Sequence, residues 1–155
     1  MKMVSLSERE IGLDLLMPLI KERLAVGQSV RFGPKGTSML PMLRQGIDNV
    51  VLSPLPGKLK KYDLPLYQRE NGQYVLHRIV KAGDTYTCIG DNQFILEPDV
   101  RHDQMIGVVT AFYRGKRRVS VTGLAYRLYC RFWHISRTPR HFWRCLKGKV
   151  GRLLK

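Results

Sequence analysis

The sequence predicts a mainly β protein, built as a small rolled or barrel-like antiparallel sheet with an N-terminal helix and a C-terminal basic helical pair. Three observations lead to this class. Residues 29–121 contain seven short β-type runs separated by turn residues, whereas the segments on either side have helical spacing of apolar residues. Many short strands with few helices between them favour a closed or rolled sheet. A chain of 155 residues also suits one hydrophobic core and is too short for two.

Charge and texture divide the chain into an N-terminal helix at 1–27, a β domain at 28–122 and a basic helical tail at 123–155. Residues 1–113 carry 14 Lys and Arg against 12 acidic residues, whereas residues 114–155 carry 13 Lys and Arg and no acid. So uneven a distribution predicts an anionic partner for the tail: a lipid surface, a nucleic acid or an acidic protein.

The N-terminal segment is predicted as an amphipathic helix over residues 5–26. Ser7 is its expected cap, and Gly27 ends it. Pro18 in the interior predicts a kink or a split into two short helices. Four residues at helical spacing form the expected buried stripe: Leu13, Leu16, Ile20 and Leu24.

The central segment is predicted as antiparallel strands joined by short turns. The expected strands are Ser29–Phe32, Asn49–Ser53, Leu64–Arg69, Tyr74–Lys81, Thr85–Ile89, Met105–Tyr113 and Arg117–Val121. Asn71-Gly72 is a strong signal for a tight hairpin, which pairs the third of these strands with the fourth.

The tail is predicted as two cationic amphipathic helices separated at Pro139, the second running over His141–Leu154. Basic and aromatic residues interleave along it: Arg127, Arg131, Arg137, Arg140 and Arg144 with Tyr126, Tyr129, Phe132, Trp133, Phe142 and Trp143. This composition is typical of a membrane interface with anionic lipid. Packing of the aromatic side chains on the sheet is the second interpretation, and binding of nucleic acid is the third.

The sequence predicts a cytoplasmic protein that is peripheral to a membrane, with neither a transmembrane helix nor a signal peptide. The longest stretch without Asp, Glu, Lys or Arg is Gln104–Tyr113, and a spanning helix needs about 18 or more apolar residues. Charged residues interrupt the N-terminal region where a signal peptide has its apolar segment. An odd number of cysteines, at positions 88, 130 and 145, also agrees with a reducing compartment.

Ser38 is the first candidate for chemistry, because it lies in a glycine-preceded turn, Gly36-Thr37-Ser38, shortly before Pro41. A nucleophile needs an exposed hydroxyl with backbone N–H groups nearby to hold an oxyanion, and a tight turn supplies both. The same composition is also ordinary for a loop, so this motif alone does not decide the matter.

Further sequence blocks follow this serine in a fixed order. They are Ser38-Met39-x-Pro41, Leu59-x-x-Tyr62-Asp63, Val75-Leu76-His77-Arg78-Ile79-Val80, Gly90-Asp91-Asn92 and Ile106-Gly107-Val108-Val109. In this order and spacing the series resembles the type I signal peptidases, which share a β-rich catalytic fold with self-cleaving phage and SOS-type repressors. The resemblance covers about residues 30–113 and implies a sheet of the signal-peptidase type.

The resemblance implies a serine peptidase in which Ser38 is the nucleophile and His77 is the general base, in the position where most of the family has lysine. This places the chain near the branch that uses histidine. It implies supporting roles for Asp91 and for an acid at or near Glu97, where the family favours aspartate. The backbone around Thr37 and Ser38 would hold the oxyanion, with no metal or cofactor.

Histidine suits the role of base, since the neutral imidazole accepts a serine proton near neutral pH without the large pKa shift that lysine requires. Strand alternation predicts Lys81 on the same face as His77, as a second candidate base. Asp63 is expected to bond backbone N–H groups in a turn, with Tyr62 in place of the glycine that the family has there.

Three alternatives remain at this stage. The repeated spacing Cys130-x3-His134 and His141-x3-Cys145 suits zinc, although buried thiols and a basic helix face explain it more simply. The second alternative is a repressor-type relative that cleaves only itself or a bound partner. The third is a catalytically silent module that binds lipid or nucleic acid through its tail.

Overall fold

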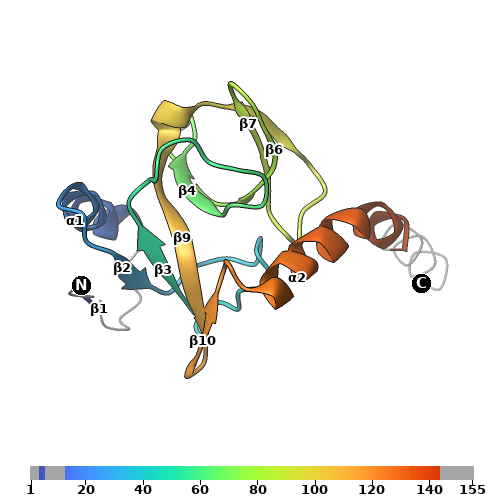
Figure 1. Ribbon diagram of the computed structural model, residues 1–155. Helices are drawn as coiled ribbons and strands as arrows, with labels where there is room; N and C mark the ends of the chain where they lie inside the picture. The colour runs from blue at the N-terminus through green and yellow to red at the C-terminus, as the bar shows by residue number, and fades with distance from the viewer. Residues whose placement is uncertain (1–3, 6–12, 144–155) are drawn as a thin grey trace, which may run out of the picture.

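The computed structural model describes residues 4–5 and 13–143 of the chain, and its elements are arranged as two sheets between two helices (Figure 1). In chain order the elements are β1 (Val4–Ser5), α1 (Leu13–Ala25), β2 (Val30–Phe32), β3 (Asn49–Ser53), β4 (Pro65–Gln68), β5 (Tyr74–Leu76), β6 (Arg78–Ala82), β7 (Tyr86–Ile89), β8 (Glu97–Val100), the 3-10 turn η1 (His102–Gln104), β9 (Met105–Arg114), β10 (Arg117–Ser120) and α2 (Leu124–Ile135). Helical residues resume at 137 and continue to 143, after a turn at Ser136.

The predicted mainly antiparallel fold is confirmed, but the strands form two open sheets. The larger sheet has the order β1-β2-β3-β9-β4-β5, with β10 also paired to β9, and the smaller has the order β6-β7-β8. All pairs are antiparallel except β1 with β2. The predicted Asn71-Gly72 hairpin joins β4 to β5, with Tyr67 opposite Val75.

The long strand β9 organises the larger sheet. One edge pairs with β3, and the other is shared between β4 and β10. Gly107 lies where β9 passes closest to its neighbours: a Cβ there would meet the side chain of Leu52 and the carbonyl oxygen of Ser53 at 2.9 Å, and Leu24 of α1 at 3.0 Å. Glycine therefore allows α1 to pack closely against this part of the sheet.

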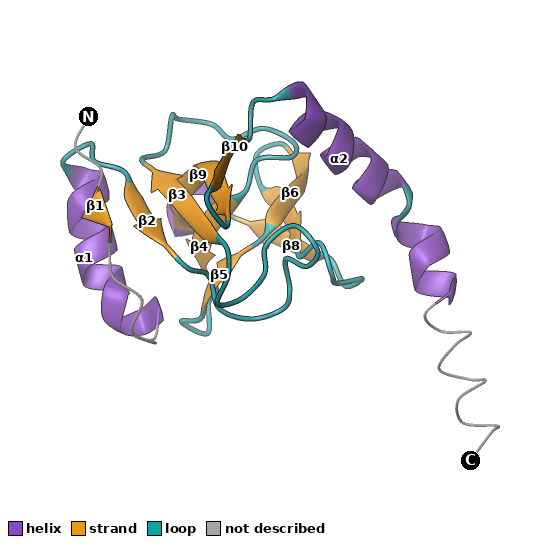
Figure 2. Cartoon of the chain, turned by 90° about the horizontal axis from the view of Figure 1, so that it is seen from below, coloured by secondary structure: helices purple, strands orange, loops and turns teal. Residues whose placement is uncertain are grey.

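Two hydrophobic clusters fill the interior. The first joins α1, the larger sheet and α2, and it also holds Met39, Met42 and Leu43 from the long segment between β2 and β3. The second lies around the smaller sheet and includes Tyr67 and Cys88. Figures 1 and 2 both show α1 and α2 on opposite sides of the sheets.

The N-terminal prediction was partly wrong. Ser5, which was expected to start the helix, lies in β1, and α1 runs from Leu13 to Ala25 without a split at Pro18. The ring of Pro18 is on the exposed side of the helix. Ile20 and Leu24 are buried as expected, together with Met17. Leu13 and Leu16 are partly buried against the first cluster.

The tail follows the prediction in its first helix and departs from it afterwards. α2 ends at Ile135, and the turn falls at Ser136 rather than at Pro139. Pro139 lies in the first turn of the following helical segment, where the missing N–H group removes no helical hydrogen bond. The predicted helix over His141–Leu154 lies outside the described residues from 144 onward. None of the described helices is long and apolar enough to cross a bilayer.

Candidate functional site

Ser38 lies in a turn in the segment between β2 and β3. The turn is closed by hydrogen bonds from Leu40 N–H to the Thr37 carbonyl, 3.2 Å, and from Leu43 N–H to the Met39 carbonyl, 2.9 Å. Met39 is buried in the first cluster, whereas Ser38 is half-buried and Thr37 is exposed. Met39 thus anchors the turn in the core, while the neighbouring Ser38 stays partly accessible to solvent.

The segment Gly90-Asp91-Asn92 holds this turn in place. The N–H group of Asn92 donates to the Ser38 carbonyl over 2.7 Å, and its side-chain amide donates to the Thr37 carbonyl over 3.1 Å. A Cβ at Gly90 would lie 2.7 Å from the Ser38 carbonyl oxygen, so only glycine allows this approach. Two blocks more than 50 residues apart in the sequence are therefore brought together at Ser38.

The groups expected to hold the oxyanion, at Thr37 and Ser38, have no hydrogen-bond partner among the described residues. Within residues 13–143, the N–H groups of Thr37 and Ser38 and the Thr37 hydroxyl make no hydrogen bond to another described residue. The Ser38 hydroxyl is likewise without a hydrogen bond in that range. The turn therefore combines one free hydroxyl with free backbone donors, as a nucleophile and its oxyanion hole require.

His77 lies at the junction of β5 and β6, where the chain passes from the larger sheet to the smaller one. Its side chain is 2% exposed. Nδ1 is 3.0 Å from Oε1 of Glu97 on β8 and 3.4 Å from the hydroxyl of Tyr67 on β4. Tyr67 itself donates to Oε2 of Glu97 over 2.7 Å.

This network assigns the two ring nitrogens of His77. Because the Tyr67 proton is directed to Glu97, and Oε1 of Glu97 lies 3.0 Å from Nδ1 of His77, we assign the proton of the neutral imidazole to Nδ1. Nε2 then carries the lone pair, and it makes no hydrogen bond to any residue that the structure describes. Arg69 completes the group with a two-point ion pair to Glu97, donating from Nε over 2.9 Å and from Nη2.

Burial and charge set the protonation of this group. Burial lowers the pKa of His77 below its ordinary value of 6.5, although the Glu97 carboxylate raises it in part. Burial acts to raise the pKa of Glu97, but hydrogen bonds from Arg69 and Tyr67 and the nearby His77 bring it below its ordinary value. The pair therefore holds a neutral imidazole and an ionised carboxylate near neutral pH.

Ser38 and His77 are not hydrogen-bonded to each other in this structure. Ser38 lines a pocket of about 90 Å³ together with Tyr74, Val75 and Leu76, the three residues of β5 that precede His77, but His77 is not among the lining residues. A Ser-His pair therefore has to form when substrate binds, as catalytic hydrogen bonds often do.

Asp91 binds the residue that follows His77. It forms a buried two-point ion pair with Arg78, with both contacts at 2.8 Å. Tyr129 of α2 donates to the same carboxylate over 3.0 Å, and Trp133 donates to the Asp91 carbonyl over 2.7 Å. Burial acts to lower the pKa of Arg78, but Asp91 outweighs it and raises that pKa well above its ordinary value. Asp91 thus ties the Ser38 turn, the residue after His77 and α2 together.

The expectation that Lys81 shares a face with His77 was wrong. The pairing of β6 with β7 shifts register between Ile79 and Lys81, which breaks the alternation after His77. Lys81 is exposed, whereas His77 is buried. The irregularity therefore separates the second candidate base from Glu97 and Tyr67.

Asp63 lies in the turn that the sequence indicated. Its carboxylate accepts a hydrogen bond of 2.7 Å from the N–H group of Lys60. Tyr62, which precedes it, has a φ of 77°, in the left-handed region that glycine adopts without strain. The glycine of the resembled family would fit this backbone, and the tyrosine ring instead packs against the first cluster.

The zinc alternative gains nothing from the described residues. Cys130 is buried and lies 2.9 Å from Nη1 of Arg78, which is a cationic neighbour unsuited to a metal ligand. Cys145 lies outside the described residues. No group of three or more His, Cys, Asp or Glu residues suited to a metal occurs in the part of the chain that the structure describes.

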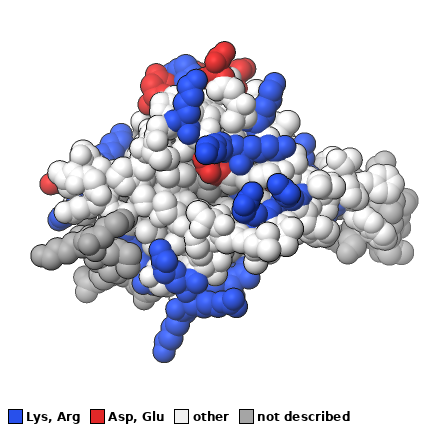
Figure 3. Space-filling view, in the orientation of Figure 1, with Lys and Arg blue, Asp and Glu red and all other residues white. Residues whose placement is uncertain are grey.

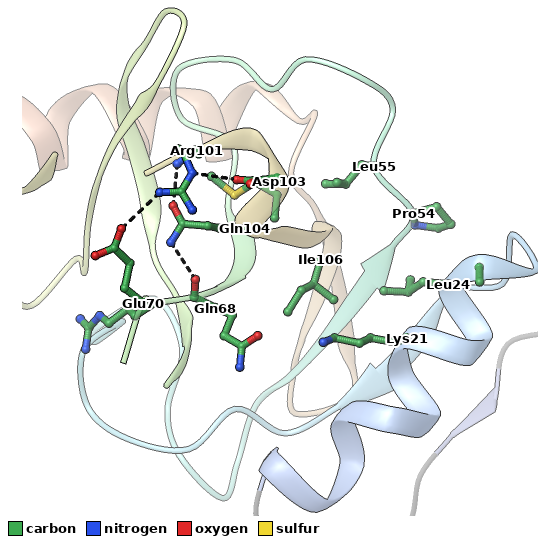
Figure 4. Close-up of a pocket in the computed structure, with 13 residues that line it drawn as sticks. Lys21, Leu24, Pro54, Leu55, Gln68, Glu70, Arg101, Asp103, Gln104 and Ile106 are labelled. Carbon is green, nitrogen blue, oxygen red and sulfur yellow. Dashed lines mark hydrogen bonds and ion pairs between the residues drawn. The ribbon is translucent and has the colours of Figure 1, made fainter. Parts of the chain in front are cut away.

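A larger hollow lies away from Ser38, between α1, the end of β4 and η1 (Figure 4). Its volume is about 580 Å³. The polar side chains in it contact one another: Arg101 pairs with Glu70 and Asp103, each at 3.2 Å, and Gln104 donates to the Gln68 carbonyl over 3.0 Å. Ser38 and His77 are not among its lining residues, so it is a weaker candidate for the reaction site.

Tyr67 and Arg69 are site residues that the sequence did not single out. Tyr67 lies on β4 and Arg69 directly follows that strand, and both side chains contact Glu97. In the sequence, however, they are 30 and 28 positions away from Glu97. No local pattern indicates such a contact.

Comparison with protein-family models, with curated proteins and with solved structures found no match to this chain.

Proposed function

We propose that this protein is a serine endopeptidase of the signal-peptidase-like type, which hydrolyses a peptide bond in a leader or signal-type peptide through an acyl-enzyme on Ser38. The observation that carries the proposal is the contact of Glu97 with Nδ1 of His77, which leaves Nε2 as an acceptor in a buried group next to the β5 segment that adjoins Ser38. A carboxylate that orients a histidine by its second nitrogen is the arrangement that activates serine nucleophiles on unrelated folds.

In the proposed reaction, Nε2 of His77 takes the proton from the Ser38 hydroxyl as Oγ attacks the carbonyl carbon of the substrate. Backbone N–H groups at Thr37 and Ser38 hold the oxyanion. The C–N bond then breaks, and the imidazolium gives its proton to the leaving amine. A water molecule, which gives a proton to His77, then attacks the acyl ester. The ester bond breaks, and the carboxylic acid product and the Ser38 hydroxyl are released. This chemistry needs no metal or cofactor.

The surroundings of Ser38 support an extended peptide as substrate. β5 is the last strand in the order of the larger sheet, and in the described part of the chain it pairs only with β4. Its other edge is therefore open to a further strand, which main-chain hydrogen bonds can hold. The 90 Å³ pocket between β5 and the Ser38 turn is lined mainly by apolar residues and has room for a small side chain.

The test is cleavage of a peptide library by the purified protein, with products mapped by mass spectrometry and Ser38→Ala as control. We expect cleavage that requires Ser38 and favours small residues before the cut. A self-cleaving relative would process its own chain and no added peptide. A silent binding module would show neither cleavage nor labelling of Ser38 by a serine-reactive probe.

A further inference from the structure

α2 presents two opposite faces. The inner face contacts the β domain: Tyr126 accepts a hydrogen bond of 2.7 Å from Arg78, Tyr129 donates to the Asp91 carboxylate, and Trp133 donates to the Asp91 carbonyl. Tyr129 and Trp133 also stack on each other, with ring centroids 5.7 Å apart. The side chains of Tyr126, Tyr129 and Trp133 are thus used in contacts within the protein.

The outer face of α2 is an exposed apolar stripe. It consists of Leu124 (72% exposed), Leu128 (55%), Phe132 (67%) and Ile135 (75%). At about 100° per residue these four positions span an arc of about 80° on the helix. An apolar stripe that the fold leaves in contact with solvent is typical of an interaction surface.

A basic pocket adjoins this stripe. Lys60 and Lys61 from the β domain and Arg127 and Arg131 from α2 line a hollow of about 370 Å³, and Asp63 is the one acidic side chain among its described lining residues. Figure 3 shows Lys and Arg side chains gathered on the face of the molecule beside α2. On the helix, both arginines lie at one border of the apolar stripe. Two separate parts of the chain therefore supply positive charge to one place.

The geometry points to an anionic lipid site: α2 lies in the surface of a bilayer, with its outer stripe among the acyl chains and the pocket of Lys60, Lys61, Arg127 and Arg131 on a phospholipid headgroup. Apolar residues bordered by cationic ones suit an interfacial helix on anionic lipid.

Two other partners fit these residues less well. A nucleic acid offers phosphates but would leave the apolar stripe exposed, and of the α2 rings that could stack on bases, Tyr126, Tyr129 and Trp133 are held on the inner face. A second copy of the chain would bring the same four cations together, which like-charge repulsion opposes.

The lipid site has a consequence for the proposed peptidase, and this step alone rests on the proposed function. The inner face of α2 binds Asp91, and the neighbouring Asn92 binds the carbonyls of Thr37 and Ser38. A bilayer-bound α2 therefore fixes the Ser38 turn at the lipid surface, within reach of membrane-bound peptides.

The experiment is co-sedimentation of the full chain with vesicles of phosphatidylcholine, with and without phosphatidylserine. We expect binding only to the anionic vesicles. Changing Lys60, Lys61, Arg127 and Arg131 to Gln should weaken binding on the order of a hundredfold or more. The matched control changes Lys81, Lys116, Arg117 and Arg118 to Gln, which removes the same charge outside the pocket and should weaken binding much less. Equal losses in the two variants would overturn the site.

The stripe is tested separately with Leu128→Asp and Phe132→Asp, which alter exposed positions and should leave the fold intact by circular dichroism. Both should abolish binding to anionic vesicles. Cleavage of a soluble peptide should continue, so a failure of the lipid site is distinguishable from a failure of the proposed peptidase. Undiminished binding by these variants, or release of the protein from vesicles by RNA with a steep salt dependence, would contradict the inference.

Discussion

Oε1 of Glu97 lies 3.0 Å from Nδ1 of His77, and Arg69 and Tyr67 hold the carboxylate in that position. Glu97 comes from β8 of the smaller sheet, and His77 lies at the junction of β5 and β6, where the chain passes from the larger sheet to the smaller one. A carboxylate fixed in this way determines which nitrogen of the imidazole carries the proton. The proposed mechanism depends on that assignment.

Glu97→Gln should lower turnover about 100-fold or more, because the variant no longer fixes the tautomer of His77 or stabilises its charged form, and positioned proton transfer contributes roughly 10²–10⁴. Turnover of a soluble peptide is the measurement. Glu70→Gln is the matched control, since that carboxylate is exposed and pairs with Arg101. Full activity in Glu97→Gln would show that this carboxylate plays no part.

Activity should rise with pH through a midpoint below 6.5 and then stay constant. The neutral imidazole is the active form, and burial lowers the pKa of His77 below 6.5, so the base is already neutral at pH values where an exposed histidine is charged. Because Glu97 raises this pKa in part, Glu97→Gln should move the midpoint lower still. The pH profile of kcat/KM and NMR titration of the His77 ring provide the check. A midpoint above 6.5 would disagree with the buried site.

Gly90→Ala should lower turnover at least tenfold while the protein stays folded. The added Cβ would lie 2.7 Å from the Ser38 carbonyl oxygen, so the Ser38 turn has to shift, and misplacement by about 1 Å is enough to cost about 10²-fold in rate. Gly83→Ala is the control, because its Cβ would meet only the Thr85 carbonyl, at 3.8 Å. Equal activity in the two variants would separate this turn from the reaction.

Asp91→Asn should destabilise the fold by about 3 kcal/mol, because it leaves the buried Arg78 without its charged partner. For a domain of this size that corresponds to a loss of roughly 6–12 °C in Tm. Asp103→Asn removes an exposed ion pair with Arg101 and should cost less than about 1 kcal/mol. Thermal unfolding followed by circular dichroism makes the comparison. A similar small loss in both variants would mean that Asp91 does not anchor Arg78.

Strands with alternating or β-branched residues were predictable from the sequence, and β3 was predicted to the residue. β8 was missed because its sequence, Glu-Pro-Asp-Val, contains two acids and a proline, which suit only an edge strand. The predicted strand Tyr74–Lys81 is instead two strands in different sheets. No local pattern in the sequence marks that change of sheet at His77.

The same limit applies to the candidate site. Ser38, His77 and Glu97 were singled out through an ordered series of motifs, which fixes residues but not contacts. Asp91 pairs with Arg78, 13 positions away, and Glu97 pairs with His77, 20 positions away. These pairings depend on how the chain packs in three dimensions. The roles of Tyr67 and Arg69 depend on the same long-range packing.

The most direct test of the account is the peptide turnover of Ser38→Ala, His77→Ala, their double variant and Lys81→Ala, measured on folded proteins. If Ser38 and His77 act as one unit, each single variant loses on the order of a thousandfold or more and the double variant is little worse. Lys81→Ala should stay close to the parent, because Lys81 is exposed and lies beyond the irregularity in β6. Full loss in Lys81→Ala with activity retained in His77→Ala would contradict the Ser-His assignment, and unchanged turnover in Ser38→Ala would contradict the proposed peptidase altogether.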